Sequence, residues 1–311
     1  MYNEEIKERF AKSYTEKPAV RKHYRRLFDI SQRYEEERGS DLYTMNAKDI
    51  ETIIVEASGV SSQSLKTNLQ LIKAYIKWCD DQGFHDVCRE ILQTKSVISE
   101  KMKATTVTSP AHLQKYLDSV FSPEDDDTID VVYRTYFWLA YAGIVLDDIF
   151  KITEKDVSFE DMTIKYGGVD YPIYREGLKA IRKCITLDHI NVYNHSRTTP
   201  SVLNRFDSNI LMRGGRCLLT KDTTKTMVNR KQRDAKQEGK TSISMGFFKV
   251  WISGLFYRMY MDELAGIKPD FLPLVKKIDS AKENKNEYPD INRRAKLYHE
   301  DYLTWKSLLN K

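Results

Sequence analysis

The chain has 311 residues, of which 41% are hydrophobic and 31% are charged, and its formal net charge at pH 7 is +5. This composition excludes an intrinsically disordered chain, and the length suffices for two domains. The sequence lacks both an apolar run of the ~18 residues that a membrane span needs and a secretory signal, since its N-terminus reads MYNEEIKERF. We therefore expect a cytoplasmic globular protein that does not associate with membranes.

The cysteines and histidines give no sign of a metal site. Cys79, Cys88, Cys184 and Cys217 lack the close or repeated spacing of zinc and disulfide frameworks. His189 and His195 lie near each other but lack a third ligand. We expect free cysteines in a reducing compartment, and neither a metal nor a cofactor.

Residues 1–93 show helical periodicity. In residues 17–38, five apolar side chains recur at helical spacing and form one stripe: Val20, Tyr24, Leu27, Ile30 and Tyr34. Pro18 suits the first turn of this predicted helix, and Gly39 suits its C-terminal end. Further helices are predicted from the Asn46 cap through residues 49–57, from near Ser61 to about Gln82, and over residues 86–93. The pattern predicts a small bundle of four or five helices.

Residues 94–108 are rich in Lys, Ser and Thr and lack an apolar stripe, which favours a linker. Ser109 and Pro110 then open a helix, and residues 129–143 predict an apolar core helix. Two β-rich runs flank Gly167-Gly168, which predicts two or three antiparallel strands in residues 157–174. Helical character returns over residues 175–184, 224–237, 245–265 and 291–308, while 185–222 stay unassigned. The predicted fold is mainly α with a small antiparallel β-sheet.

The best local motif is YFWLAYAGIVLDDIFKITEKDVSFEDMTI, at residues 136–164. Together with the order of elements, it resembles the tyrosine recombinase and phage integrase family over nearly the whole chain. In that family's pattern T-G-L-R-x-S-E-L, Ala142-Gly143-Ile144 stand for T-G-L, and Val145 stands where the first catalytic arginine belongs. The resemblance implies a two-domain clamp, with a helical core-binding (SAM-like) domain at 1–93, a linker at 94–108 and a catalytic-like domain at 109–311.

A second motif, SISMGFFKVWISGLFYRMYMDELAG, resembles the region that carries the family's H-x-x-R box. The box then falls on Phe248 to Trp251, where neither histidine nor arginine is present, and no H-x-x-R occurs from 240 to 270. The resemblance makes Lys165 the counterpart of the family's sheet lysine. It leaves Tyr298 and Tyr302 as alternatives for the former nucleophile.

These substitutions matter because strand cleavage by a tyrosine builds negative charge on the scissile phosphate. Paired arginines normally hold that charge, and losing one such donor typically costs about 10²–10³-fold in rate. Valine, phenylalanine and tryptophan neither donate to phosphate nor carry charge, so we expect no recombinase activity. The alternative is an active, divergent recombinase in which relocated arginines take over, with four candidates: Arg134, Arg213, Arg216 and Arg258.

Two segments are strongly basic. Residues 17–26 hold five cations and no acidic residue: Lys17, Arg21, Lys22, Arg25 and Arg26. Residues 213–240 hold nine cations against three acidic residues: Arg213, Arg216, Lys221, Lys225, Arg230, Lys231, Arg233, Lys236 and Lys240. Either run is also compatible with a solvated helix face. Their presence in both domains of a fold whose relatives clamp DNA favours contacts to phosphate.

Base recognition needs polar side chains on a helix that enters the major groove. The start of the third predicted helix offers such side chains: Ser62, Ser64, Lys66, Thr67 and Asn68. The counterpart in the second domain is the segment with Lys225, Asn229, Arg230, Lys231 and Arg233. The alternative for the residues at the start of the third predicted helix is a helix N-cap followed by side chains that face solvent.

The sequence thus predicts a double-stranded DNA-binding transcriptional regulator without catalysis. It resembles integrase-derived phage repressors of lysogeny of the SPbeta type, which implies a place at the nucleoid of a bacterial host. The alternatives are the active recombinase and an accessory module that binds another recombinase. Self-association through the C-terminal helix, over residues 290–311, and an unidentified protein or peptide modulator stay open.

Overall fold

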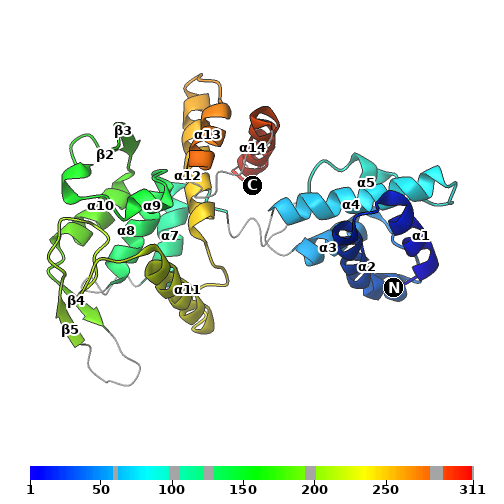
Figure 1. The fold of residues 1–311 in the computed structure, drawn as a ribbon, viewed down its shortest axis with the longest axis horizontal. Helices are drawn as coiled ribbons and strands as arrows, with labels where there is room; N and C mark the ends of the chain where they lie inside the picture. Colours follow the sequence, from blue (N-terminus) through cyan, green and yellow to red (C-terminus); the bar gives the residue numbers. More distant parts are fainter. Residues whose placement is uncertain (59–61, 98–105, 122–128, 193–200, 281–289, 310–311) are drawn as a thin grey trace. The chain divides into compact units, whose positions relative to one another are not determined.

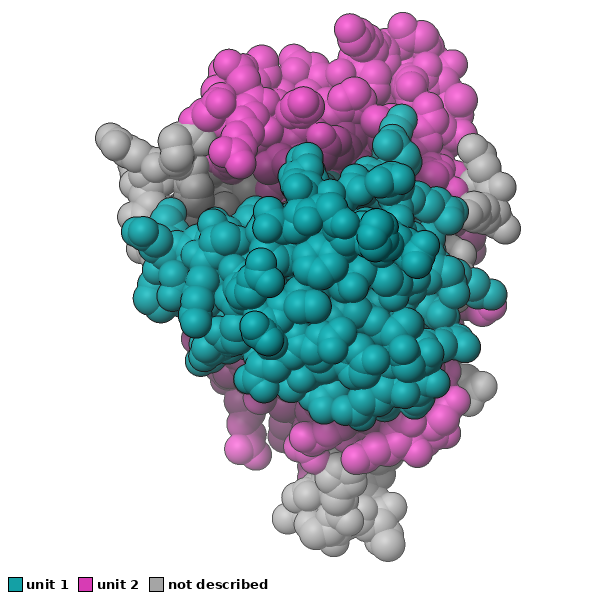
Figure 2. Space-filling view, turned by 90° about the vertical axis from the view of Figure 1, so that its right-hand side faces the viewer, with its two compact units in different colours: residues 1–104 teal, residues 105–311 magenta. Residues whose placement is uncertain are grey.

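The computed structural model describes residues 1–58, 62–97, 106–121, 129–192, 201–280 and 290–309, without the side chains of 62, 63, 192 and 278–280. The chain divides into two compact units, Met1–Ala104 and Thr105–Lys311 (Figure 2). This boundary falls within the predicted linker 94–108. The fold is mainly helical with small antiparallel sheets, which confirms the predicted fold class (Figure 1). Among the described residues, none of the helices has the length and apolar content needed to cross a bilayer.

Unit 1 consists of helices that largely match the periodicity of the sequence: α1 (Glu4–Tyr14), α2 (Pro18–Arg38), α3 (Ala47–Ser58), α4 (Ser62–Asp81) and α5 (Glu90–Gln93). Pro18 lies in the first turn of α2. Gly39 ends that helix in the left-handed conformation, at φ 62°, with its N–H near the carbonyls of Glu35 and Glu36. The helix α1 was not predicted, because its charged sequence hides the apolar face formed by Phe10 and Ala11.

An aromatic cluster fills the core of unit 1. The Phe10 ring lies 4.9 Å from the ring of Tyr24 and 5.1 Å from that of Tyr75, both edge to face. Phe28 completes the cluster, 5.0 Å from Tyr75. Such edge-to-face pairs stabilise a core beyond the area they bury. The cluster therefore joins α1, α2 and α4 around one centre.

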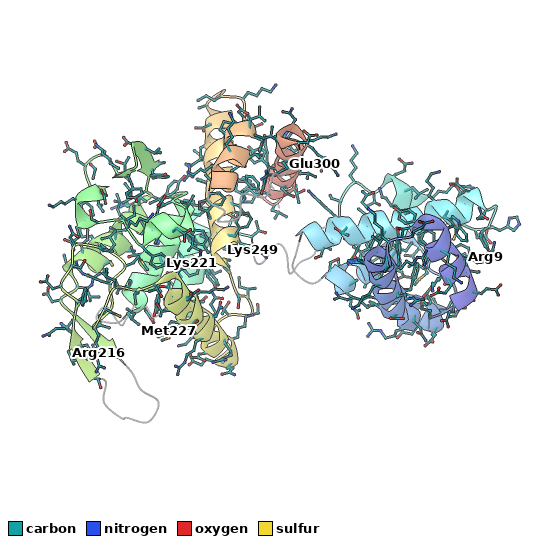
Figure 3. The ribbon with its side chains drawn as sticks, in the orientation of Figure 1. Arg9, Arg216, Lys221, Met227, Lys249 and Glu300 are labelled. Carbon is teal, nitrogen blue, oxygen red and sulfur yellow. The ribbon has the colours of Figure 1, made fainter. Side chains whose placement is uncertain are left out.

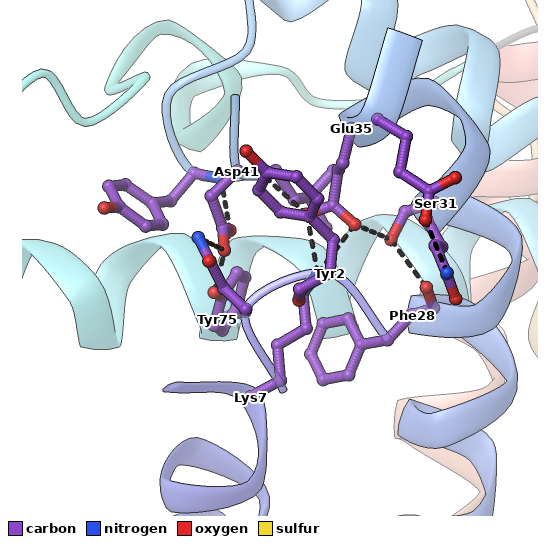
Figure 4. A network of polar contacts seen from close by, with 12 residues as sticks. Tyr2, Lys7, Phe28, Ser31, Glu35, Asp41 and Tyr75 are labelled. Carbon is purple, nitrogen blue, oxygen red and sulfur yellow. Dashed lines mark hydrogen bonds and ion pairs between the residues drawn. The ribbon is translucent and has the colours of Figure 1, made fainter. Parts of the chain in front are cut away.

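A buried ion pair fastens α1 to α2. The Lys7 ammonium lies 2.6 Å from both oxygens of Glu35, and both side chains are fully buried (Figure 4). Glu35 also accepts hydrogen bonds from the Ser31 hydroxyl at 2.9 Å and from the Leu42 N–H at 2.7 Å. Burial raises the pKa of Glu35, while Lys7 opposes that rise. Donors from Lys7, Ser31 and Leu42 thus partly compensate the carboxylate for its removal from water.

Unit 2 begins with three helices, α7 (Pro110–Val120), α8 (Asp130–Tyr141) and α9 (Leu146–Ile149), and a 3-10 turn, η1 (Glu154–Asp156). A three-stranded antiparallel sheet follows, with β1 (Val157–Ser158), β2 (Thr163–Tyr166) and β3 (Val169–Pro172) in the order β1-β2-β3. Gly167 and Gly168 join β2 to β3 with φ of 60° and 74°, as a two-residue hairpin requires. This sheet confirms the predicted β segment.

The remaining elements of unit 2 are α10 (Arg175–Thr186), the hairpin β4 (His189–Val192) and β5 (Ser201–Asn204), α11 (Lys221–Gln237), α12 (Phe247–Leu264), α13 (Leu272–Ser280) and α14 (Ile291–Lys306). The hairpin lies in the stretch that the sequence left unassigned. Arg205 organises that stretch, because its guanidinium donates to the carbonyls of Cys184, at the end of α10, and of Leu211, the latter at 3.0 Å. The helix α13 was not predicted.

Helix α8 forms the centre of unit 2, and its closest neighbour is α12. A Cβ atom added at Gly254 would lie 2.7 Å from the carbonyl carbon of Tyr141, so only glycine permits this crossing. Further along the chain, the Trp305 indole N–H donates to the Val107 carbonyl at 2.9 Å, which holds α14 against the start of the same unit. His195 and residues 310–311 lie outside the described residues.

We expect Lys7→Met to lower the free energy of unfolding by about 3–5 kcal/mol, because Glu35 would keep a buried charge without its cation. The double variant Lys7→Met/Glu35→Gln should recover much of that loss, since glutamine is neutral and keeps an oxygen for the Leu42 N–H. Urea denaturation of the full chain measures both values. Equal destabilisation in the single and double variants would contradict the role of the ion pair.

We expect Gly254→Ala to lower the free energy of unfolding by about 3 kcal/mol, because the methyl group would push α12 away from α8. Intrinsic helix propensity predicts the opposite sign, a gain of about 1 kcal/mol. Gly246→Ala measures the effect of a Cβ without a steric clash, since a Cβ there would meet nothing within 4 Å, and we expect it to cost only the preference for glycine at the N-cap of α12. A neutral Gly254→Ala in urea denaturation would refute the close approach.

Candidate nucleic-acid interface

The basic run of unit 1 lies at the start of α2, but its members differ in what they contact. The Arg21 Nε donates to the Thr15 carbonyl at 2.8 Å, and Arg25 pairs with Glu8 at 3.0 Å. Lys22 and Arg26 are exposed, and the described residues include no ion-pair partner for either. The cationic surface of α2 therefore rests on Lys22 and Arg26, with Lys17 at the N-cap.

The predicted recognition segment begins α4. Ser64, Lys66 and Thr67 are partly exposed, while Ser61 and the side chain of Ser62 lie outside the described residues. Asn68 does not fit the prediction of a base-reading residue, because it is only 4% exposed. Its amide donates to the Ser58 hydroxyl at 2.8 Å, and its Oδ1 lies 3.0 Å from Nε2 of His23.

A cavity of about 270 Å³ opens between α2, α3 and α4. Its polar lining includes His23, Arg26 and Ser64, and its apolar lining includes Leu27 and Ile30. His23 was missed in the sequence, although it lies within the basic run and three residues before Arg26. One face of α2 thus presents both side chains at helical spacing.

Helix α11 carries the basic run of unit 2. Thr220 caps the helix, and its hydroxyl accepts from the Thr223 N–H at 3.2 Å. Thr224, Val228, Gln232 and Ala235 face the core. Exposed polar side chains occupy the opposite face: Lys225, Asn229, Arg230, Arg233 and Lys236. In Figure 3, Lys221 and Met227 mark this helix and Arg216 marks the preceding loop, where its side chain is exposed.

Four members of that exposed face form a continuous stripe. Lys225, Asn229, Arg233 and Lys236 follow one another at intervals of four, four and three residues, so they lie along one line of the helix. The Asp234 carboxylate contacts Arg233 of the stripe and the neighbouring Arg230, and both contacts are long, at 3.8 and 3.9 Å. These long contacts leave the guanidinium groups largely unshielded.

Two predicted DNA contacts are committed to carboxylates instead. Arg213 is only 11% exposed and donates to Glu154 at 2.7 Å. Lys231 lies 2.9 Å from Asp130, a buried carboxylate at the start of α8. Neither cation fits the prediction of a phosphate contact, because using it on DNA would strip a partly or fully buried carboxylate of its partner. Both instead fix elements of unit 2 to one another.

Apolar packing occupies the positions where the resemblance places catalytic arginine and histidine. Val145 packs against the core at the N-cap of α9. Trp251 is buried at 2% exposure, and its ring lies 5.7 Å from that of Phe248, which is exposed. None of these side chains can hold a phosphate oxygen by charge. These three side chains can contact an apolar or aromatic surface but carry no charge, whereas Lys249 is a cation within the same box.

The other residues that the resemblance names as counterparts of catalytic residues are Lys165, Tyr298 and Tyr302, and two of them have carboxylate partners. Lys165 pairs with Asp161 at 2.6 Å within the hairpin. Tyr302 is buried, and its hydroxyl donates to Glu263 at 2.6 Å. Burial, reinforced by that carboxylate, raises the pKa of Tyr302, which disfavours the tyrosinate that attacks a phosphate. Tyr298 is partly exposed on the same helix, α14.

The arginines proposed to take over catalysis differ in their surroundings. Arg134 donates to Asp118 at 2.5 Å and to the Phe121 carbonyl at 3.0 Å. The Arg258 guanidinium donates to the Tyr141 carbonyl at 3.1 Å, against Gly143, and burial lowers its pKa. Arg216 alone of the four is exposed. Among the described residues, no group of three or more His, Cys, Asp and Glu side chains could hold a metal ion.

Comparison with known families gives one match, over the N-terminal quarter of the chain. Residues 1–81 match the family model described as "MrpR, N-terminal core-binding domain". No curated protein matches the chain in sequence. The matched residues cover α1, α2, α3 and α4, so both the basic start of α2 and the cavity lie inside the matched region.

Solved structures with a similar course of the chain include three recombinases and integrases. The XerA recombinase is 12% identical, with 99% of this chain and 98% of that chain covered and a TM-score of 0.39. The Tn1549 transposon integrase, in complex with circular intermediate DNA, is 14% identical, with 94% of each chain covered and a TM-score of 0.36. A lambda integrase dimer bound to a COC' core site is 14% identical, with 92% and 98% covered and a TM-score of 0.32. Identities this low give no information about which residues are catalytic.

We expect Lys225→Gln and Lys231→Gln to have opposite signatures. Lys225→Gln should reduce the slope of log affinity for duplex DNA against log salt by about 0.9 while leaving the free energy of unfolding unchanged. Lys231→Gln should leave the slope unchanged and cost about 1–2 kcal/mol of unfolding free energy, because Asp130 loses its partner. Fluorescence anisotropy across a salt series and urea denaturation measure the two quantities. A reduced slope in Lys231→Gln would place that lysine on DNA.

Proposed function

We propose that this chain is a sequence-specific, double-stranded DNA-binding transcriptional regulator that does not cleave DNA. The stripe on α11 is the observation that carries the proposal: three exposed cations and an asparagine lie along one helical line, and the contact of Arg233 with Asp234, at 3.8 Å, is at the margin of ion-pair distance. Lysine and arginine in such a line match the spacing of backbone phosphates, and the asparagine can read an adenine edge. Lys22 and Arg26 add a second cationic surface in unit 1.

The absence of cleavage follows from chemistry at the degenerate positions. A phosphotransfer site needs preorganised positive charge where the phosphate develops its negative charge. Val145, Phe248 and Trp251 supply none, and Tyr302 is tied to Glu263. Under this proposal the chain retains the DNA-holding surfaces of a recombinase and has lost the groups that break the strand.

The more specific form of the proposal is a phage-type repressor that controls lysogeny. Two observations support it: the sequence resembles integrase-derived phage repressors, and residues 1–81 match the MrpR core-binding model. Under this proposal, the partner is duplex DNA at specific operators, and the chain acts at the nucleoid of the bacterial host.

Genome-wide footprinting followed by anisotropy on the recovered sites tests DNA binding. We expect a small set of related sites, bound with a strong salt dependence, and weaker binding to unrelated duplex. Changing Lys225, Arg233 and Lys236 together to Gln should weaken all duplexes by at least ~100-fold, as the loss of three phosphate contacts predicts. If the intact chain binds no site at low salt, the accessory-module alternative replaces the proposal.

A nicked suicide substrate built on a recovered site tests the absence of catalysis. We expect no covalent protein–DNA adduct after denaturing electrophoresis, because the scissile phosphate has no guanidinium pair to hold it. Matched reactions with Tyr298→Phe and Tyr302→Phe serve as controls. An adduct that disappears in either variant would establish an active recombinase and overturn this part of the proposal.

A further inference from the structure

The cavity between α2, α3 and α4 combines a cationic rim with a partly apolar floor. His23 and Arg26 reach it from α2, and Ser64 and Asn68 reach it from α4. Leu27, Ile30 and Ala57 provide the apolar part of the lining. All of these side chains belong to unit 1, so the cavity is a property of that unit alone.

Charge in this cavity is not balanced internally. Glu56 is the carboxylate in the lining, but its Oε2 accepts from Arg33 at 2.8 Å and from the Tyr34 hydroxyl. Arg26 makes no ion pair or hydrogen bond within the part of the chain that the structure describes. A guanidinium at a cavity rim, beside a carboxylate already satisfied by another arginine, attracts an anion.

A chain of hydrogen bonds orients His23 at this rim. The Ser58 hydroxyl donates to the Ile54 carbonyl at 2.6 Å, so its lone pairs accept from the Asn68 amide at 2.8 Å. The amide orientation then leaves Oδ1 of Asn68 to accept from Nε2–H of His23, at 3.0 Å. Because Asn68 is buried, this chain fixes the imidazole beside Arg26 with its Nδ1 uncommitted to Asn68.

We propose that this cavity is an oxyanion site that takes a phosphate group. Arg26 supplies the charge and guanidinium donors, and His23 donates from Nδ1 when its imidazole carries a proton on both nitrogens, since Nε2–H is given to Asn68. Asn68 and Ser58, which also belong to the lining, are positioning residues, because their hydrogen bonds orient His23.

A phosphate can reach the cavity from two sources, the backbone of bound DNA or a free phosphorylated small molecule. The first source deepens the proposed function and rests on it, whereas the second would make unit 1 responsive to a ligand. The chemistry of recognition is shared, so the experiment has one arm for each source.

The first arm titrates the full chain with inorganic phosphate at constant ionic strength, followed by ¹H–¹⁵N spectra of the histidine side chains. We expect a saturable shift of the His23 signals, assigned with His23→Gln. Arg26→Gln should weaken phosphate at least ~10-fold, as the loss of one charge-assisted hydrogen bond predicts. Arg25→Gln is the matched control on the same helix, because Arg25 pairs with Glu8 outside the cavity.

The positioning role has its own readout. Asn68→Ala should weaken phosphate in the wild-type background but not in the His23→Ala background, because its effect passes through the imidazole. Ser58→Ala is the milder variant, and urea denaturation confirms that each variant is folded. If Asn68→Ala changes the phosphate affinity equally in both backgrounds, Asn68 does not act through His23, and the positioning role is refuted.

The second arm adds duplex DNA. Displacement of duplex by saturating phosphate assigns the site to the DNA backbone, and simultaneous binding assigns it to a free phosphorylated molecule. No saturable His23 shift, or one that Arg26→Gln leaves unchanged, overturns the oxyanion site. Because the first arm contains no DNA, that failure leaves the proposed function standing, and a chain that binds phosphate but no duplex would fail only the proposed function.

Discussion

Ion pairs within the protein determine which lysine and arginine side chains are available to bind an anionic ligand. A carboxylate removed from water holds its cation strongly, because parting them leaves a charge in a poorly polarisable environment. Three cations form such ion pairs: Lys7 with Glu35, Arg213 with Glu154 and Lys231 with Asp130. Because each such pair is neutral, the net charge of +5 does not show which cations are available to bind a ligand. Among the described residues, exposed cations for which the structure shows no ion-pair partner include Lys22 and Arg26 on α2 and Lys225 and Lys236 on α11.

Packing between helices α8 and α12 determines the surroundings of the positions that the sequence resemblance names as catalytic. Helix α12 crosses α8 so closely that Gly254 has no room for a side chain, and Trp251 is buried in the packing beside it. Arg258, two turns further along the helix, is used to bind the Tyr141 carbonyl. Apolar packing and a backbone hydrogen bond therefore occupy this part of unit 2. Under the proposed function, the duplex is held by the surfaces that this packing leaves outside.

Sequence periodicity predicted most of the fold because most helices have one apolar and one polar face. It failed for α1, whose buried Lys7 breaks the apolar stripe, and for the stretch around Arg205, where an arginine rather than apolar side chains organises the chain. At the candidate interface, the exposed stripe of α11 follows from spacing alone. Asn68 and Lys231 were assigned to DNA because sequence shows polarity but not burial or pairing. His23 was overlooked because its partner is 45 residues away.

Lysine footprinting by acetylation and mass spectrometry, with and without an operator duplex, tests this partition of charges most directly. The account predicts that DNA protects Lys22, Lys225 and Lys236, whereas the low reactivity of Lys7 and Lys231 stays the same in both states. Protection confined to Lys231, with Lys225 and Lys236 as reactive on DNA as off it, would contradict the account.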